Sequence, residues 1–364
     1  MMFRFKFLRN ILIISLNTFL LVTNSTAQQK ATISIDFSRL GARVSPDLHG
    51  IFFEEISHAG EGGLYAELIR NRGFEDTRLP QGTTLIDSFI VPPRTPGFTI
   101  PDNGISDWKM RLPWKSPYPG WSIKTEKGAI ITASITSDYP LNIATPHSMK
   151  LEVEETSDKG LVHLVNDGFW GINAIEGDDY YFSFYLRTNK GYNGNVMISL
   201  RTDDGTVLAA RTFSHQNSRK WKKLECTLRP NKTFGRAKLF ITLNQKGTVW
   251  VDFVSLFPAK TFKNRRNGLR KDLADYIDSL KPSFIRWPGG CFVEGINIQS
   301  APDWKRTIGP VEQRPGTFSP WGYWTSDGLG YHEFLQFCED IHANALFVFN
   351  GGISCEYRSG TFAP

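Results

Sequence analysis

Between residues 121 and 258 the chain alternates apolar and polar residues with a period of two, which is typical of β-strands with one buried face. Two turn signals fall between such strands, an Asp-Gly pair at 204–205 and NQKG at 244–247, and each predicts a hairpin. Roughly seven short strands of this kind predict a β-sandwich. The side chains expected to face its interior are Met149, Leu151, Val153, Phe182, Phe184 and Leu186.

On either side of this stretch, apolar strands alternate with segments of helical periodicity. An alternating strand is predicted at 31–37. The elements that follow are a strand (50–54), a helix (63–72), a helix (266–280), a strand (283–287), a helix (331–342) and a strand (345–349). This order predicts a parallel sheet covered by helices. Polar residues after the strands favour the beginning of a (β/α)8 barrel, whose active sites lie at the C-terminal ends of the strands.

The N-terminus has the pattern of a secretory signal peptide. Three basic residues precede an apolar run at 11–22, and small residues at 25 and 27 predict cleavage after Ala27. The run is too short to span a bilayer, so we expect a secreted or periplasmic protein without a membrane span. The predicted parts are thus a signal peptide (1–27), an N-terminal strand with the first βα unit (28–78), a Pro- and Gly-rich linker with the sandwich (79–260), and the continuation of the α/β part (261–364).

Charge and cysteine content exclude several functions. Removing the signal peptide, which holds three basic and no acidic residues, lowers the formal net charge from +6 to 39 − 36 = +3. No dense basic block remains outside 263–271, so a nucleic-acid partner is not expected. The four cysteines are widely spaced and form no CxxC pair, so neither a zinc site nor another cofactor is expected. One or two disulfides remain open for an exported protein.

Four segments carry a resemblance to a known family: HGIFFEEISHAGEGGLYAELIRNRGFE, FIRWPGGCFVEG, WKRTIGPVEQRPG and DGLGYHEFLQFCED. In this order, they resemble the α-L-arabinofuranosidases of glycoside hydrolase family 51, in the subgroup with a carbohydrate-binding-like β-sandwich inserted after the first barrel unit. The resemblance runs from about residue 43 to the end. It implies an incomplete (β/α)8 TIM barrel, with about three strands present, interrupted by a galactose-binding-like β-sandwich.

The resemblance implies an exported retaining glycoside hydrolase that removes non-reducing terminal α-L-arabinofuranosyl residues from arabinan, arabinoxylan or derived oligosaccharides. Retaining hydrolysis needs two carboxyl groups about 5 Å apart. In this family the acid/base is the glutamate of an Asn-Glu pair after the fourth barrel strand, and the nucleophile is a glutamate after the seventh. The sequence contains no Asn-Glu pair. Both residues are therefore expected beyond Pro364, and the chain is expected to be an inactive N-terminal fragment.

Two charged residues are candidates for the substrate pocket. Glu54 matches the family's substrate-binding glutamate, which accepts hydrogen bonds from sugar hydroxyls. The alternative is a structural salt bridge with Arg286 or another base. Side chains alternate along a strand, so Glu55 is expected on the opposite face. Arg286 matches an arginine that orients carboxylates in the site, and a buried ion pair without a ligand role is the alternative.

Two further positions complete the expected substrate-binding set. Cys291 matches a position that lines the sugar pocket, with a buried small hydrophobe or a disulfide partner as the alternative. Asn350 either faces the pocket or caps a turn, and Glu294 is expected to be a structural carboxylate. Aromatic residues either stack on sugar or pack in the interior; they are Trp287, Trp304, Trp321 and Trp324 near the pocket, and Trp170 and Tyr180 in the sandwich.

Two other functions stay open at this point. In the first, the chain is a non-catalytic carbohydrate-binding protein that acts through the sandwich. In the second, it is an enzyme of similar barrel architecture with another substrate, such as a different furanosidase or an endo-acting glucanase. The oligomeric state is not indicated by the sequence.

Overall fold

A computed structural model describes residues 31–95, 108–156 and 160–364. The predicted signal peptide, residues 1–27, lies outside them. The chain divides into two units, Met1–Ser45 and Pro46–Pro364, which are described separately. In the first unit, residues 31–37 form no strand and their apolar side chains are exposed, so the strand predicted there is wrong. A strand needs a neighbour that completes its hydrogen bonds and covers its apolar face, and the described part of this unit has neither.

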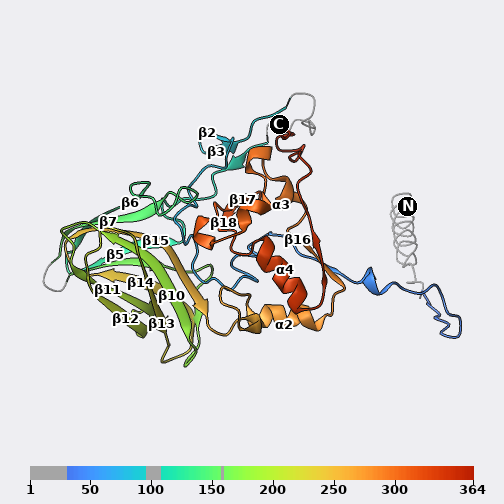
Figure 1. The fold of residues 1–364 in the computed structure, drawn as a ribbon, viewed down its shortest axis with the longest axis horizontal. Helices are drawn as coiled ribbons and strands as arrows, with labels where there is room; N and C mark the ends of the chain where they lie inside the picture. The colour runs from blue at the N-terminus through green and yellow to red at the C-terminus, as the bar shows by residue number, and fades with distance from the viewer. Residues whose placement is uncertain (1–30, 96–107, 157–159) are drawn as a thin grey trace, which may run out of the picture. The chain divides into compact units, whose positions relative to one another are not determined.

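The alternating segment in the second unit folds into two antiparallel sheets that share one apolar core (Figure 1). The six residues predicted to face the interior are all buried. One sheet has the order β13 (Lys222–Leu228), β10 (Tyr180–Thr188), β15 (Gly247–Pro258), β7 (Ser148–Glu155) and β6 (Ile130–Thr136). The other has the order β12 (Val207–Gln216), β11 (Gly194–Arg201), β14 (Phe234–Leu243), β8 (Leu161–Asn166) and β5 (Trp121–Glu126), and β9 (Ile172–Ala174) pairs with β14.

One of the two predicted hairpins is confirmed. Strands β11 and β12 pair antiparallel around the Asp-Gly turn, and Gly205 has the positive φ of +90° that such a turn requires. The hairpin predicted at NQKG is wrong, because β14 and β15 belong to different sheets. Gly247 has φ +137°, and a Cβ there would lie 2.9 Å from the backbone nitrogen of Tyr192. The turn therefore carries the chain across the sandwich instead of returning it beside β14.

A three-stranded parallel sheet forms the α/β part, in the order β1 (Ile51–Phe52), β16 (Phe284–Trp287) and β19 (Asn344–Phe347). Helices α2 (Lys271–Ser279) and α4 (Tyr331–Asp340) precede β16 and β19, and Figure 1 shows α4 beside β16. These strands and helices confirm the predicted elements. However, α2 begins later than predicted, and Tyr276 and Leu280, two apolar residues within the predicted range, are exposed.

The helix predicted at 63–72 is wrong, because no residue of this segment is helical. The N–H of Leu68 donates to the carbonyl of Leu256 in β15, and the N–H of Leu256 donates to the carboxylate of Glu67. The same carboxylate pairs with Arg72 at 3.2 Å. Distant partners thus supply the hydrogen bonds that a helix would have made, and tertiary contacts override the local propensity.

Shorter elements fill the connections. Residues 79–115, predicted to be irregular, contain a small sheet of β2 (Thr84–Ile86), β3 (Phe89–Val91) and β4 (Met110–Arg111). The long loop after β16 holds α3 (Cys291–Glu294), the hairpin of β17 (Thr317–Ser319) and β18 (Tyr323–Thr325), and short 3-10 helices at Ile298–Ser300, Trp304–Thr307 and Val311–Gln313. Two more 3-10 turns lie at Pro46–Leu48 and Phe262–Asn264. No helix among the described residues is long and apolar enough to cross a membrane.

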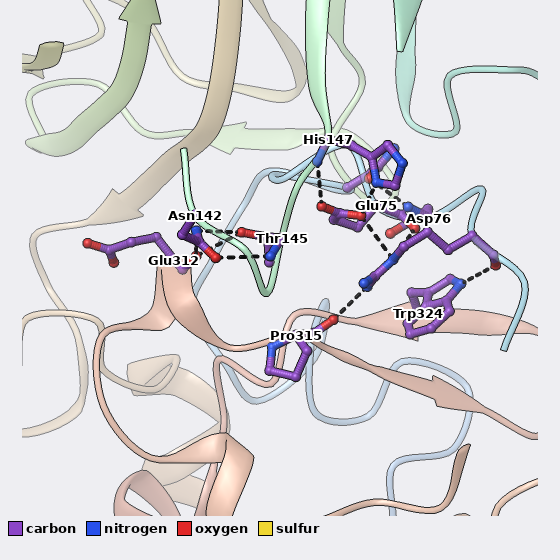
Figure 2. Close-up of polar contacts among 10 residues, drawn as sticks. Glu75, Asp76, Asn142, Thr145, His147, Glu312, Pro315 and Trp324 are labelled. Atoms are coloured by element: carbon purple, nitrogen blue, oxygen red, sulfur yellow. Dashed lines mark hydrogen bonds and ion pairs between the residues drawn. The ribbon is translucent and has the colours of Figure 1, made fainter. Parts of the chain in front are cut away.

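Polar contacts join the sandwich to the long loop of the α/β part (Figure 2). Asn142 and Thr145, in the segment before β7, donate to the Glu312 carbonyl at 2.5 Å and 2.9 Å. The carboxylate of Glu75 accepts from the N–H of His147 at 3.0 Å. The bonds to Glu312 hold the loop after β16 against the sandwich, and the bond to Glu75 holds the segment before β2 against it.

Candidate active site

The C-terminal edge of the parallel sheet brings together residues that are far apart in the sequence. Phe52, Arg286 and Leu346 are neighbours in register, so their side chains share one face of the sheet. The residues that alternate with them along the strands, such as Ile285 and Trp287, face α2 and α4 and are buried. The open face is therefore distinct from the face that the helices cover.

Glu54 lies two residues beyond Phe52, above a Gly-Gly turn. Its Oε1 accepts the N–H of Phe292 at 3.0 Å, at the start of α3. Gly289 has φ +142°, and a Cβ there would lie 2.3 Å from the Glu54 Cγ. Only glycine fits this close approach. The turn that follows β16 thus fixes the Glu54 carboxylate beside Gly290 and leaves its remaining lone pairs for hydroxyl donors.

Arg286 is half-buried, with its guanidinium 4.4 Å from the centre of the Phe52 ring. Glu54 and Arg286, which are both described by the structure, do not form the salt bridge that was the alternative prediction. The arrangement is a cation–π contact on the open face of the sheet. The structure thus places Arg286 on the neighbouring strand to Glu54 without joining the two side chains.

Cys291 is exposed and follows the Gly-Gly turn directly. All four cysteines, which lie in the described residues, are free thiols, so Cys291 is not a disulfide partner in this structure. Glu294, at the end of α3, approaches Arg358 at 3.7 Å, which agrees with a structural carboxylate. Among these side chains, Cys291 is the one placed beside the Glu54 turn and open to solvent.

Asn350 follows β19 and uses its amide to connect loops. Its Nδ2 donates to the carbonyl of Val293 at 2.8 Å and to that of Ile353 at 3.2 Å. Its Oδ1 accepts the N–H of Gly352 at 2.7 Å. These bonds match the turn-capping alternative, and they tie the end of β19 to α3.

A buried carboxyl network behind Glu54 was not predicted. Glu55 is buried, its Oε1 accepts the Tyr323 hydroxyl at 3.0 Å, and its Oε2 accepts the N–H of Glu61 at 3.2 Å. Burial raises the pKa of Glu55 to about 8 and the pKa of Glu61 to about 7. Alternation along the strand already indicated that Glu55 faces away from Glu54. The Tyr323 hydroxyl and the Glu61 N–H donate to the carboxyl and partly offset this rise. Tyr323 comes from the later loop, so its contact with Glu55 carries no local signal.

A cavity of about 50 Å³ lies on the helix-facing side of the sheet. Glu55 and Glu61 line it together with an aromatic cluster in which Trp304 lies 4.8 Å from Tyr331 between ring centres. Of the predicted site residues Asn350 lines this cavity, and the other three do not. The cavity thus adjoins the edge that carries Glu54, since Phe292 lines it and donates its N–H to Glu54.

The tryptophans near the site mostly pack against other side chains. Trp287 is buried and stacks on Phe53 at 4.8 Å between ring centres. The Arg78 guanidinium lies 4.4 Å from the Trp324 ring, and the Trp324 indole N–H donates to the Arg78 carbonyl. Trp321 remains partly exposed. No group of three or more metal-binding side chains occurs within the described ranges.

Comparison with known proteins adds to this geometry. Residues 276–362 match the family model of the alpha-L-arabinofuranosidase 1 domain. Alpha-L-arabinofuranosidase 1 of Arabidopsis thaliana is 37% identical over 327 residues, which are 89% of this chain and 43% of that protein. The chain is a homologue of the α-L-arabinofuranosidases. An extracellular exo-alpha-L-arabinofuranosidase of Streptomyces chartreusis is 31% identical over 87% of this chain and 34% of that protein.

A solved structure agrees with this relationship. An arabinose-bound α-L-arabinofuranosidase of glycoside hydrolase family 51 superposes with a TM-score of 0.69 at 31% identity, covering 86% of this chain and 45% of that one. This arabinofuranosidase homologue thus spans less than half the length of the relatives that it matches. The family resemblance that the four sequence segments indicated is confirmed.

Proposed function

We propose that this chain supplies the arabinofuranosyl-binding edge of an exported, retaining α-L-arabinofuranosidase. The substrate class is arabinose-containing polysaccharides and their oligosaccharides, from which terminal α-L-arabinofuranosyl groups are removed. The observation that carries the proposal is the Glu54 carboxylate, held over the Gly289 turn at the C-terminal edge of a parallel sheet. Catalytic residues of sheet enzymes of this kind lie at that edge, and the chain's relatives are arabinofuranosidases.

The fold proposal is that β1, β16 and β19 are strands of a (β/α)8 barrel, and that residues 79–260 are inserted after its first unit. The parallel pairing of β1 with β16 across the intervening sandwich supports this. Phe52 and Leu346 on the open face are 51% and 48% exposed, whereas parallel sheets normally have both faces covered. Coverage of that face by further barrel strands would remove this apolar surface from water. The proposed parts keep the boundaries 28–78, 79–260 and 261–364.

The proposed roles follow from side-chain chemistry. Glu54 accepts hydrogen bonds from sugar hydroxyls, and Cys291 lines the same pocket beside it. Arg286, an always-charged group on the same sheet face, orients carboxylates around the sugar. Asn350 positions the loop that carries Cys291 through its bond to Val293. The acid/base and the nucleophile of a retaining mechanism are assigned to none of these residues.

Hydrolysis of 4-nitrophenyl α-L-arabinofuranoside by the protein made from its complete gene tests the proposal. We expect arabinose release, and we expect Glu54→Gln to lower kcat/KM roughly 10- to 100-fold, mainly through KM, because a charged acceptor for sugar hydroxyls is lost. Glu294→Gln is the matched control, since this carboxylate lies in the loop beside Arg358 and its change should leave kcat/KM unaltered. Equal rates in wild type and Glu54→Gln would refute the role of Glu54.

Two other outcomes decide between the alternatives. Binding to polysaccharide without hydrolysis would favour a non-catalytic carbohydrate-binding protein, and hydrolysis of another furanoside or of a glucan would change the substrate class. Export is tested by the mass of the mature protein in the secreted or periplasmic fraction, which should correspond to cleavage after Ala27. The extracellular relative supports this expectation.

A further inference from the structure

A second groove lies away from the Glu54 edge, between the sandwich and α2. It has a volume of about 600 Å³. The sandwich contributes Phe169 and Trp170, which lie between β8 and β9, and Asn173, which lies in β9. The α/β part contributes the start of α2. Neither Glu54 nor any other predicted substrate-binding residue lines it. We refer to it as the Trp170 groove.

Trp170 is unusual because the residue is 67% exposed. Large aromatic side chains are normally buried, so an exposed indole on the wall of a groove needs a reason. The other aromatic candidate of the sandwich, Tyr180, is buried, and its hydroxyl donates to the Asn173 carbonyl. Tyr180 therefore forms part of the floor, and Trp170 supplies the accessible ring.

The loop that carries Trp170 is held in place. The N–H of Gly168 donates to the side chain of Asn166 at 2.9 Å, and the N–H of Gly171 donates to the Asp167 carbonyl at 3.0 Å. Phe169 packs on Gly62, where a Cβ would lie 2.6 Å from the ring. A loop held in this way loses little backbone conformational entropy when a ligand binds to Trp170.

The charged groups around the groove balance one another. Asp178 pairs with Lys260, Asp272 with Arg270, and Asp275 with Lys271. A fourth carboxylate in the lining, Glu67, is buried and pairs with Arg72. The four carboxylates and their four cationic partners therefore give no net charge, and no single-sign field attracts an ionic polymer. Their oxygens and N–H groups still offer acceptors and donors to hydroxyl groups.

An exposed indole, an apolar floor and a neutral rim rich in donors and acceptors match the chemistry of an uncharged sugar chain. The C–H faces of a sugar ring pack on the indole, while the hydroxyls bond to the rim. We propose that the Trp170 groove binds an uncharged oligosaccharide segment of the polysaccharide substrate, as a second site separate from the Glu54 edge. This rests on the proposed function for the identity of the glycan.

Affinity gel electrophoresis of the full-length protein tests the groove, with neutral arabinoxylan or polygalacturonate cast into the gel. We expect arabinoxylan to retard the wild type and polygalacturonate to have no effect. Trp170→Ala should weaken arabinoxylan binding about tenfold or more, as truncation of a central aromatic contact does. Trp170→Phe should retain most of the binding because it keeps an aromatic face. Tyr276→Ala, an exposed aromatic residue on α2 outside the groove lining, is the matched control and should bind as wild type does.

The outcomes separate this inference from the proposed function. Absence of arabinoxylan binding, or equal binding by wild type and Trp170→Ala at unchanged Tm, would refute the proposal that the Trp170 groove binds a glycan. Preference for polygalacturonate would overturn the argument from charge balance. Trp170-dependent binding by a protein that does not hydrolyse the aryl arabinofuranoside would leave the groove intact and refute the proposed function alone.

Discussion

The buried carboxyl of Glu55 makes a sharp prediction about stability and pH. Its pKa is raised to about 8 by burial, whereas the same group in the unfolded chain titrates near its ordinary value of 4.5. Between these two values the folded protein holds a proton that the unfolded chain has lost. The free energy of unfolding therefore falls as the pH rises through this window, and the stabilisation is complete only below the unfolded pKa.

The magnitude follows from the size of the shift. The pKa of Glu55 is about 8 in the folded protein against 4.5 in the unfolded chain. At about 1.36 kcal/mol per tenfold change in proton affinity, this corresponds to at most about 5 kcal/mol. Replacing Glu55 by Gln keeps a neutral group of the same size beside Tyr323. At about pH 5, Glu55→Gln should lie within about 1 kcal/mol of wild type, the net value of one hydrogen bond. At about pH 8 it should be more stable than wild type by about 2–5 kcal/mol.

Urea unfolding followed by tryptophan fluorescence at several pH values measures this difference. Asp76, whose pKa is also raised to about 8, adds to the pH dependence of both proteins and cancels in the comparison. Glu61, whose pKa is raised to about 7, is electrostatically coupled to Glu55, so the measured difference belongs to the pair. Glu176→Gln, at an exposed carboxylate, is the control and should parallel wild type. Parallel curves for wild type and Glu55→Gln would show that Glu55 is ionised in the folded protein, and the reasoning would be wrong.

Two further substitutions test the contacts that build the site and its support. Gly289→Ala should lower the free energy of unfolding by about 2–3 kcal/mol and displace the Glu54 side chain. The new Cβ would lie 2.3 Å from the Glu54 Cγ, and the positive φ disfavours alanine. Urea unfolding measures the first effect, and KM for the aryl arabinofuranoside measures the second. Glu67→Ala should cost about 3–5 kcal/mol in the same unfolding assay, because it leaves the buried Arg72 guanidinium without its 3.2 Å partner.

Each of these substitutions has a matched control. Gly351→Ala should change stability little, since nothing lies within 4 Å of the added Cβ. A similar loss in both glycine variants would argue against the close approach to Glu54. For Glu67→Ala the control is Glu176→Ala, at an exposed carboxylate. If both glutamate variants unfold at the same urea concentration as wild type, the ion pair contributes nothing measurable.

Much of the fold was predictable because its periodicity is local. Period-two alternation identified the strands that became β7 and β10, and helical spacing identified the helix at 331–342 that became α4, whose buried residues are Phe334, Phe337 and Cys338. Burial of an apolar face requires such patterns wherever a strand or helix covers a core. The position of Glu54 at a strand end was predictable for the same reason.

Other features depend on contacts between distant segments. The helical pattern of 63–72 did not produce a helix, because β15 and the carboxylate of Glu67 bind its backbone. The NQKG turn joins two sheets because the strand after it finds partners in β10 and β7. Neither partner is encoded near the segment that it changes, so propensity and turn chemistry mispredicted both.

The sequence by itself determined the main strands of the sandwich, the order of helices and strands from α2 to β19, and the family to which the chain is related. Tertiary structure decided which side chains meet: Glu54 with the Phe292 N–H, Glu55 with Tyr323, and Trp170 with the start of α2 across a groove. The physical reason is that a periodic pattern records which face of an element is buried. Which element covers that face, and which polar groups lose water there, depends on chain segments hundreds of residues away.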